Sequence, residues 1–186
     1  MKNRCGWVGT EEIYRNYHDE EWGVPEYDSR ALWEKLILDG FQAGLSWITI
    51  LKKRDAFREA FEGFQPDVIA TWGVGDVERL LANPGIIRHR GKIEATIGNA
   101  RAYLALAEEQ SFSDRIWAYV DGKPLVGEYA DRKDVPTSSD LSTQISKDLK
   151  KAGFKFVGPT IVYAWLEACG VFHNHTTDCW RYGHGL

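Results

Sequence analysis

The chain has 186 residues, of which 44% are hydrophobic and 27% charged, and its formal net charge is −4. This composition excludes a disordered or low-complexity chain and predicts a soluble globular protein, and the length suits a single domain over residues 1–186 whose lobes share one core. No apolar run approaches the roughly 20 residues of a membrane span, and the N-terminus lacks the apolar segment of a signal peptide. We therefore expect a cytoplasmic protein with no membrane partner. Three cysteines cannot all pair, so no disulfide framework is expected.

Helical spacing dominates the first half of the chain. Asp28 can cap a helix that Gly40 would end, and the apolar spacing continues over 48–61. A long amphipathic helix is expected through 93–104. No alternating run of comparable length predicts a strand, so the sequence indicates an all-α fold.

Shorter elements surround that long helix. Pro66 suits the first position of a helix that Gly73 would stop, and Asp76 can cap another short helix. Residues 121–136 contain glycines and prolines and are expected to form a long polar connection, the one candidate boundary between lobes.

Two helices near the C-terminus are joined by a short glycine-flanked segment. Residues 137–140 can cap the first helix, and Pro159 starts the second directly after the segment 153–158. Free amides at a helix N-terminus can bind a phosphate, and Lys150, Lys151 and Lys155 lie beside them. A purely structural turn is an equally good interpretation of this segment.

Positive charge is local rather than general. The acidic net charge argues against binding to nucleic acid through a bulk positive field. Basic side chains nevertheless gather in two runs, Arg88-His89-Arg90 with Lys92, and Lys147, Lys150, Lys151 with Lys155. These runs predict either a nucleic-acid face or two solvated surfaces.

Four potential metal ligands lie near the two ends of the chain. Cys5 and His18 are close to the N-terminus, while His175 and Cys179 are spaced i, i+4, which would place them on one face of a helical turn. Two thiolates and two imidazoles form a complete tetrahedral set for a structural Zn²⁺. A buried cysteine with surface histidines is the alternative, and Cys169, His173 and His184 are competing ligands.

Aromatic residues and one carboxylate suggest a binding pocket. Residues 5–25 are dense in aromatic side chains, whose faces would attract a flat cationic ligand. Asp39 lies at the helix end where the helix dipole disfavours a negative charge, although an ordinary surface acid is also possible. Leu45, between Gly44 and Ser46, could be an exposed apolar tip of the kind that is inserted between bases.

Five blocks in order resemble the 3-methyladenine DNA glycosylase I family over essentially the whole chain. They are Arg4-Cys5-Gly6-Trp7, Tyr17-His18-Asp19-Glu20-Glu21-Trp22-Gly23-Val24-Pro25, Gln42-Ala43-Gly44-Leu45-Ser46-Trp47, Gly85-Ile86-Ile87-Arg88-His89-Arg90-Gly91-Lys92-Ile93 and Gly153-Phe154-Lys155-Phe156-Val157-Gly158. The resemblance implies an all-α helix-hairpin-helix glycosylase that flips out and excises N3-methyladenine from double-stranded DNA. We expect no strand-cleaving activity, because no lysine is well placed to act as a nucleophile. We expect a monomer, because the enzyme must scan a duplex.

The resemblance also assigns roles to individual residues. It implies that Cys5, His18, His175 and Cys179 bind a structural Zn²⁺ joining the two terminal segments. It implies a base pocket formed by Asp39 as the catalytic carboxylate with Tyr17, Trp47, Trp7, Tyr14 and Trp22. It implies DNA contacts by Leu45, which fills the gap in the duplex, and by Gly44, Lys150, Lys151, Gly153, Lys155, Val157 and Gly158.

One position departs from the family pattern. The family has a glutamate where this chain has Asp39, whose side chain is one methylene shorter. A misplacement of about 1 Å can cost on the order of 100-fold in rate. A shifted pocket, a bridging water or a different substrate range could follow. Two other functions remain open: a catalytically weakened protein that binds alkylated DNA, and a zinc-dependent hydrolase with Asp178 as its base, which would need an open metal position.

Overall fold

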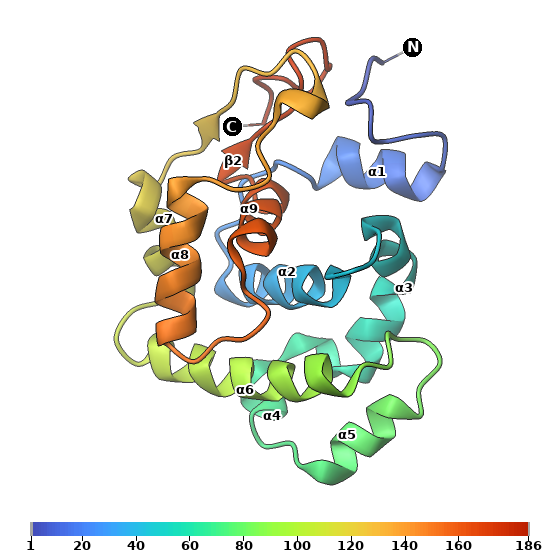
Figure 1. The fold of residues 1–186 in the computed structure, drawn as a ribbon, viewed down its shortest axis with the longest axis vertical. Helices are drawn as coiled ribbons and strands as arrows, with labels where there is room; N and C mark the ends of the chain where they lie inside the picture. The colour runs from blue at the N-terminus through green and yellow to red at the C-terminus, as the bar shows by residue number, and fades with distance from the viewer. Residues whose placement is uncertain (1, 186) are drawn as a thin grey trace.

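The computed structural model describes residues 2–185, and its regular secondary structure is almost entirely helical (Figure 1). Its elements are α1 (Glu12–Glu20), α2 (Ser29–Gln42), α3 (Trp47–Ala60), η1 (Glu62–Phe64), α4 (Pro66–Ile69), α5 (Val74–Leu81), α6 (Arg90–Ala107), α7 (Phe112–Trp117), η2 (Ala118–Val120), β1 (Leu125–Val126), η3 (Arg132–Asp134), α8 (Asp140–Lys151), α9 (Pro159–Ala168) and β2 (Phe172–His173). The described N-terminal and C-terminal segments lie at the same end of the molecule (Figure 1). Among the described helices, none has the length and apolar character needed to cross a membrane.

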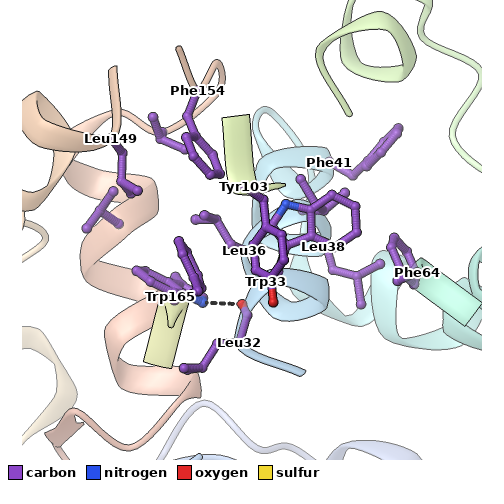
Figure 2. Packing of buried hydrophobic residues seen from close by; sticks show 14 of the residues in the cluster. Leu32, Trp33, Leu36, Leu38, Phe41, Phe64, Tyr103, Leu149, Phe154 and Trp165 are labelled. Atoms are coloured by element: carbon purple, nitrogen blue, oxygen red, sulfur yellow. Dashed lines mark hydrogen bonds between the residues drawn. The ribbon is translucent and has the colours of Figure 1, made fainter. Parts of the chain in front are cut away.

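The core is built around α2. This helix packs against α3, α6, α7 and α9, and its side chains Leu32, Trp33 and Leu36 are buried. Figure 2 shows Trp165 of α9 beside it, with the indole Nε1 donating a hydrogen bond to the carbonyl oxygen of Leu32 at 2.9 Å. Because α2 is held on several sides, the residues of its last turn have a fixed position.

The start of α2 is predicted correctly and its end is not. The Asp28 side chain accepts a hydrogen bond from the amide of Ala31 at 2.7 Å, which confirms the expected cap. The helix then continues through Gly40 to Gln42, so the predicted stop at Gly40 is wrong. A Cβ at Gly40 would be in ordinary van der Waals contact with Phe156 at 3.5 Å, so position 40 lies against the segment between α8 and α9.

Two short helices also differ from prediction. α4 ends at Ile69, and Gly73 is the N-cap of α5 instead of the stop of α4. Asp76 is the third residue of α5, and its carboxylate accepts a hydrogen bond from the Gly73 amide at 3.0 Å. The helix α5 therefore starts three residues earlier than predicted, and Asp76 stabilises its first turn from the third helical position instead of capping it.

The connection 121–136 contains a strand that periodicity could not reveal. β1 pairs in parallel with β2, with Leu125 opposite Phe172 and Val126 opposite His173. Each strand has two residues, too few for an alternating pattern to be visible. This pairing attaches the connection to the C-terminal segment.

Candidate functional site

A cavity of about 180 Å³ opens between α1, α2, α3 and α9. Its lining residues, which we call the aromatic pocket, are Trp7, Tyr14, Tyr17, Trp22, Asp39, Gln42, Trp47, Arg132, Ala164, Glu167 and Ala168. The fold thus brings together all six residues that were predicted to form a base pocket. The volume is below the roughly 300 Å³ at which pockets for drug-sized ligands begin, and it suits a smaller flat molecule.

Aromatic rings form the walls of this pocket. The rings of Tyr17 and Trp47 have their centroids 5.4 Å apart with an interplanar angle of 44°. Trp7 contacts Tyr14 and Trp22 with centroid distances of 4.9 and 5.1 Å. The faces of such rings carry partial negative charge, so the pocket favours a planar cation over a neutral ligand of the same shape.

Asp39 supplies the one carboxylate of the pocket whose oxygen has no partner. It lies in the last turn of α2, it is 4% exposed, and its Oδ2 forms no hydrogen bond. Burial raises the pKa of Asp39 well above its ordinary value; Lys35 opposes this and Glu167 adds to it. An unpaired buried carboxyl is costly to the fold, by about 1–3 kcal/mol, and is available to a donor that enters the pocket.

Glu167 and Arg132 border the pocket and were missed by the sequence analysis. The Glu167 carboxylate accepts two hydrogen bonds from Arg132, at 2.6 and 3.0 Å, and a third from Asn174 at 2.9 Å. A lone acid on the otherwise apolar helix α9 was the available signal for Glu167. Nothing in the local sequence connects it with Arg132, which lies on η3 in the long connection. Because the Glu167 carboxylate is already hydrogen-bonded to Arg132 and Asn174, Asp39 is the pocket carboxylate that can accept a hydrogen bond from a ligand.

A larger cavity of about 330 Å³ shares Tyr17 and Trp47 with the pocket but has a different character. Its charged side chains bond one another: Arg54 donates to Glu21 at 2.6 and 2.8 Å, and Arg58 donates to Glu34 at 2.6 Å. Paired charges of this kind offer little to a flat cation. The aromatic pocket is therefore the better ligand site despite its smaller volume.

The four predicted metal ligands meet in a second, buried site. The ligand atoms of Cys5, His18, His175 and Cys179, which we call the Cys/His cluster, lie within 4.8 Å of one another. Cys179 Sγ is 3.5 Å from His18 Nε2 and 3.6 Å from His175 Nδ1, and Cys5 Sγ is also 3.6 Å from that nitrogen. Hydrogen bonding to the neighbouring Cys5 thiol, followed by His175 and His18, lowers the pKa of the Cys179 thiol, while burial opposes this. The cluster could hold a metal ion.

Surrounding hydrogen bonds orient the cluster. His18 Nδ1 lies 2.8 Å from Asp19, and His175 Nε2 lies 3.1 Å from the carbonyl oxygen of Trp22. An oxygen acceptor faces the outer nitrogen of each imidazole, so that nitrogen donates its N–H and the other ring nitrogen faces the thiols, which is the orientation of metal-bound histidines. Burial acts to raise the pKa of Asp19, but hydrogen bonds from Arg4, His18 and Trp180 outweigh it and lower that pKa.

The competing ligands lie elsewhere. Cys169 is buried in the main core, and His184 is exposed. Both ring nitrogens of His173 contact the backbone, at 3.3 Å from Gly23 O and 3.2 Å from Gly183 N. The predicted helical turn carrying His175 and Cys179 is wrong: the segment forms successive turns, closed by a 2.8 Å hydrogen bond from the Cys179 amide to the Thr176 carbonyl.

Comparison with known proteins identifies the family. The family model for methyladenine glycosylases matches residues 7–182. The chain is 49% identical over 180 residues to the DNA-3-methyladenine glycosylase of Haemophilus influenzae, and the match covers 96% of this chain and 97% of that protein. It is 51% identical over 180 residues to DNA-3-methyladenine glycosylase 1 of Escherichia coli K12, covering 96% of each chain. The chain belongs to the methyladenine glycosylase family.

Solved methyladenine glycosylases share the fold. A crystal structure of a 3-methyladenine DNA glycosylase I aligns with a TM-score of 0.94 at 53% identity, covering 96% of this chain and 98% of that one. A structure on 3-methyladenine recognition by the Staphylococcus aureus enzyme aligns with a TM-score of 0.93 at 44% identity, covering 97% of both chains. Sequence similarity and fold therefore agree over nearly the whole molecule.

The residues predicted to touch DNA occupy two segments of this methyladenine glycosylase. Leu45 is 41% exposed, as expected, in a turn where Gly44 has φ of +82°. Gly44, Lys150, Lys151, Gly153 and Lys155 are also exposed, and Gly158 is half-buried. The side chain of Val157 is 1% exposed and belongs to the core, so only its backbone could meet a ligand.

Proposed function

We propose that this chain excises 3-methyladenine from DNA by hydrolysing the N-glycosidic bond. The observation that carries the proposal is the unpartnered Oδ2 of Asp39, buried in a pocket with aromatic walls. Methylation at N3 makes adenine cationic. A carboxylate such as Asp39 can balance that charge and accept a hydrogen bond from the amino group of the base. Relatives named DNA-3-methyladenine glycosylase, 49% and 51% identical to this chain, support the same activity.

The pocket chemistry explains how a methylated base would be selected. The nucleotide must leave the duplex to reach the pocket, and stacking on Trp47 would be worth roughly 1–3 kcal/mol. The alkylated base is a good leaving group without protonation, so Asp39 has to hold the cation and stabilise the developing positive charge on the sugar. Normal adenine is neutral, has a stronger glycosidic bond and gains less from the aromatic walls.

The direct test is base release from methylated duplex DNA, with 3-methyladenine and 7-methylguanine separated by chromatography. We expect the purified protein to release 3-methyladenine. The shorter Asp39 favours one rival, a protein that binds alkylated DNA with little catalysis. That rival predicts tight binding, no free base, and activity that appears in the Asp39→Glu variant.

Strand cleavage is not expected. The aromatic pocket has no lysine among the described residues, so water is the available nucleophile. Borohydride added during turnover should therefore trap no covalent protein–DNA adduct, as judged by denaturing electrophoresis. A stoichiometric adduct would show that the chain acts as a lyase.

We also propose that the Cys/His cluster binds a structural Zn²⁺. With bonds of about 2.3 Å to sulfur and 2.0 Å to nitrogen, a tetrahedral site has sulfur–nitrogen edges of about 3.5 Å. The observed separations of 3.5 and 3.6 Å fit this geometry. Four protein ligands leave no open position for a hydrolytic metal, and Asp178 is engaged at the surface by Asn3 at 2.8 Å, so the zinc hydrolase alternative has no support.

The segment between α8 and α9 fits a helix-hairpin-helix that anchors double-stranded DNA. We find no internal acceptor, within residues 2–185, for the backbone amides of Phe156, Val157 and Gly158, which immediately precede α9. These amides point to a phosphate site at the start of that helix, with Lys155 next to it. We propose that the whole chain acts as a single-domain monomer on the duplex.

Lys155 should contribute mainly through charge. Lys155→Ala is expected to weaken binding to duplexes of any sequence and to reduce the slope of log K against log salt by about one. Fluorescence anisotropy over a range of salt concentrations measures both effects. Lys123→Ala, at an exposed site near β1, is the matched control and should leave the slope unchanged.

A further inference from the structure

Phe156 is held in a conformation that a bulky side chain rarely adopts. It is 37% exposed and has φ of +56°, in the left-handed region. For a residue other than glycine this region costs roughly 1–2 kcal/mol, and an exposed ring regains little of that by packing. A glycine would fit the same turn without strain, and the part of the phenylalanine ring that stays exposed contributes nothing to the folded core.

The surrounding structure fixes Phe156 in this position. The amide of the preceding Lys155 donates to Asn99 Oδ1 at 2.8 Å, and Asn99 Nδ2 returns a hydrogen bond to the Lys155 carbonyl at 3.0 Å. Asn99 is buried on α6. Phe156 also lies against Gly40 of α2, where a Cβ would be in van der Waals contact with it at 3.5 Å. The ring is therefore presented on a rigid support.

An imidazole lies beside this ring. His89 and Phe156 are edge to face, with centroids 6.2 Å apart. His89 is exposed and is itself fixed, because its Nδ1 accepts a hydrogen bond from the Lys92 amide at 3.1 Å as the N-cap of α6. The neighbouring Arg88 is exposed and forms no ion pair with any described residue. The surface therefore combines two rings with an available positive charge.

Lys92 connects this surface with the turn that carries Leu45. It is buried, and its Nζ donates to the carbonyl oxygens of Phe41 at 2.8 Å and Ala43 at 2.6 Å. These carbonyls lie at the end of α2, immediately before the turn. Phe156 belongs to the proposed DNA-binding hairpin, and the segment that carries His89 and Lys92 is tied to the residues just before the Leu45 turn.

We propose that Phe156 and His89 form a contact surface for the sugar rings of the duplex next to the flipped nucleotide, with Arg88 on a neighbouring phosphate. The proposal rests on the proposed function. Continuity with the hairpin and with Leu45, together with the unpaired charge of Arg88, favours DNA over a protein partner. Backbone strain at Phe156 is retained because the ring supports the bent duplex.

The test is Phe156→Gly, compared with Glu62→Gly. Glu62 is exposed and has φ of +50°, so its glycine variant relieves similar strain in a different segment. We expect both variants to match or exceed the thermal stability of the wild type. Only Phe156→Gly should weaken binding to a duplex containing a tetrahydrofuran abasic analogue, by about 10-fold.

Two further measurements separate the possible failures. Titration with free 3-methyladenine, followed by tryptophan fluorescence, should be unchanged in Phe156→Gly because the aromatic pocket is intact. Wild-type affinity for the duplex in Phe156→Gly would overturn the inference and leave the proposed function standing. A loss of stability in parallel with binding would also overturn it, since the ring would then serve packing. A wild-type protein that neither binds the duplex nor releases base would contradict the proposed function itself.

Discussion

Replacing Asp39 with asparagine is expected to lower the single-turnover rate of 3-methyladenine release by about 100-fold or more. The carboxylate oxygen that has no partner in the folded protein would be the acceptor for the cationic base. An amide keeps the shape of the side chain but carries no charge to balance the cation. Chromatographic assay of released base measures the effect, and Asp178→Asn, at the exposed surface, is the matched control.

The same substitution should stabilise the protein at neutral pH. Burial raises the pKa of Asp39, so protonated Asp39 favours folding below its unfolded-state pKa. That contribution is lost as the pH rises through the raised pKa. Asparagine cannot ionise, so the thermal midpoint of the variant should exceed that of the wild type by an amount that grows with pH, as thermal melts over a pH series would show.

Catalysis should show the opposite dependence on pH. If the ionised form of Asp39 holds the cationic base, the release rate rises with pH through the raised pKa and then becomes constant. The release rate of the Asp39→Asn variant should show no such rise with pH. Release by Asp39→Asn at the wild-type rate would remove Asp39 from the mechanism, and a faster Asp39→Glu variant would show that the shorter acid is a handicap.

Loss of a ligand of the Cys/His cluster should have the second large effect. Purified protein is expected to contain one zinc ion per chain by elemental analysis, and Cys179→Ser should bind zinc poorly. Structural zinc sites supply on the order of 10 kcal/mol to small domains. Losing even half of that would lower the thermal midpoint of a chain of this size by roughly 10–20 °C.

Cys169→Ala is the matched control for this experiment. Cys169 is equally buried but lies in the main core, away from the cluster. The variant should retain its zinc and lose only a small part of its stability. Full stability of Cys179→Ser, or of the wild type prepared without metal, would show that the hydrogen bonds around the cluster are sufficient without an ion.

The sequence predicted the pocket well where its residues are close along the chain. Tyr14, Tyr17 and Trp22 lie within one aromatic segment, and Asp39 and Trp47 flank one turn. Glu167 and Arg132 could not be paired from the sequence, because their contact depends on how a connection of irregular structure folds back onto α9. Side chains that meet only in the tertiary structure leave little local signal.

The misassigned glycine and the short strands have similar explanations. A glycine commonly ends a helix, but α2 continues through Gly40 to Gln42 because its packing against α3, α6, α7 and α9 holds the last turn in place. β1 and β2 exist because two irregular segments lie side by side, and two residues are too few to show alternation. In both cases tertiary contact outweighs local preference.

Residues 7–22 supply a wall of the aromatic pocket, although segments near a chain terminus are commonly the most mobile part of a protein. His18 directly follows the pocket residue Tyr17, and His175 bonds the carbonyl of the pocket residue Trp22 at 3.1 Å. The C-terminal segment thus packs against the N-terminal segment on the side away from the pocket. Residues of the C-terminal segment, which do not line the pocket, thereby fix the position of one of its walls.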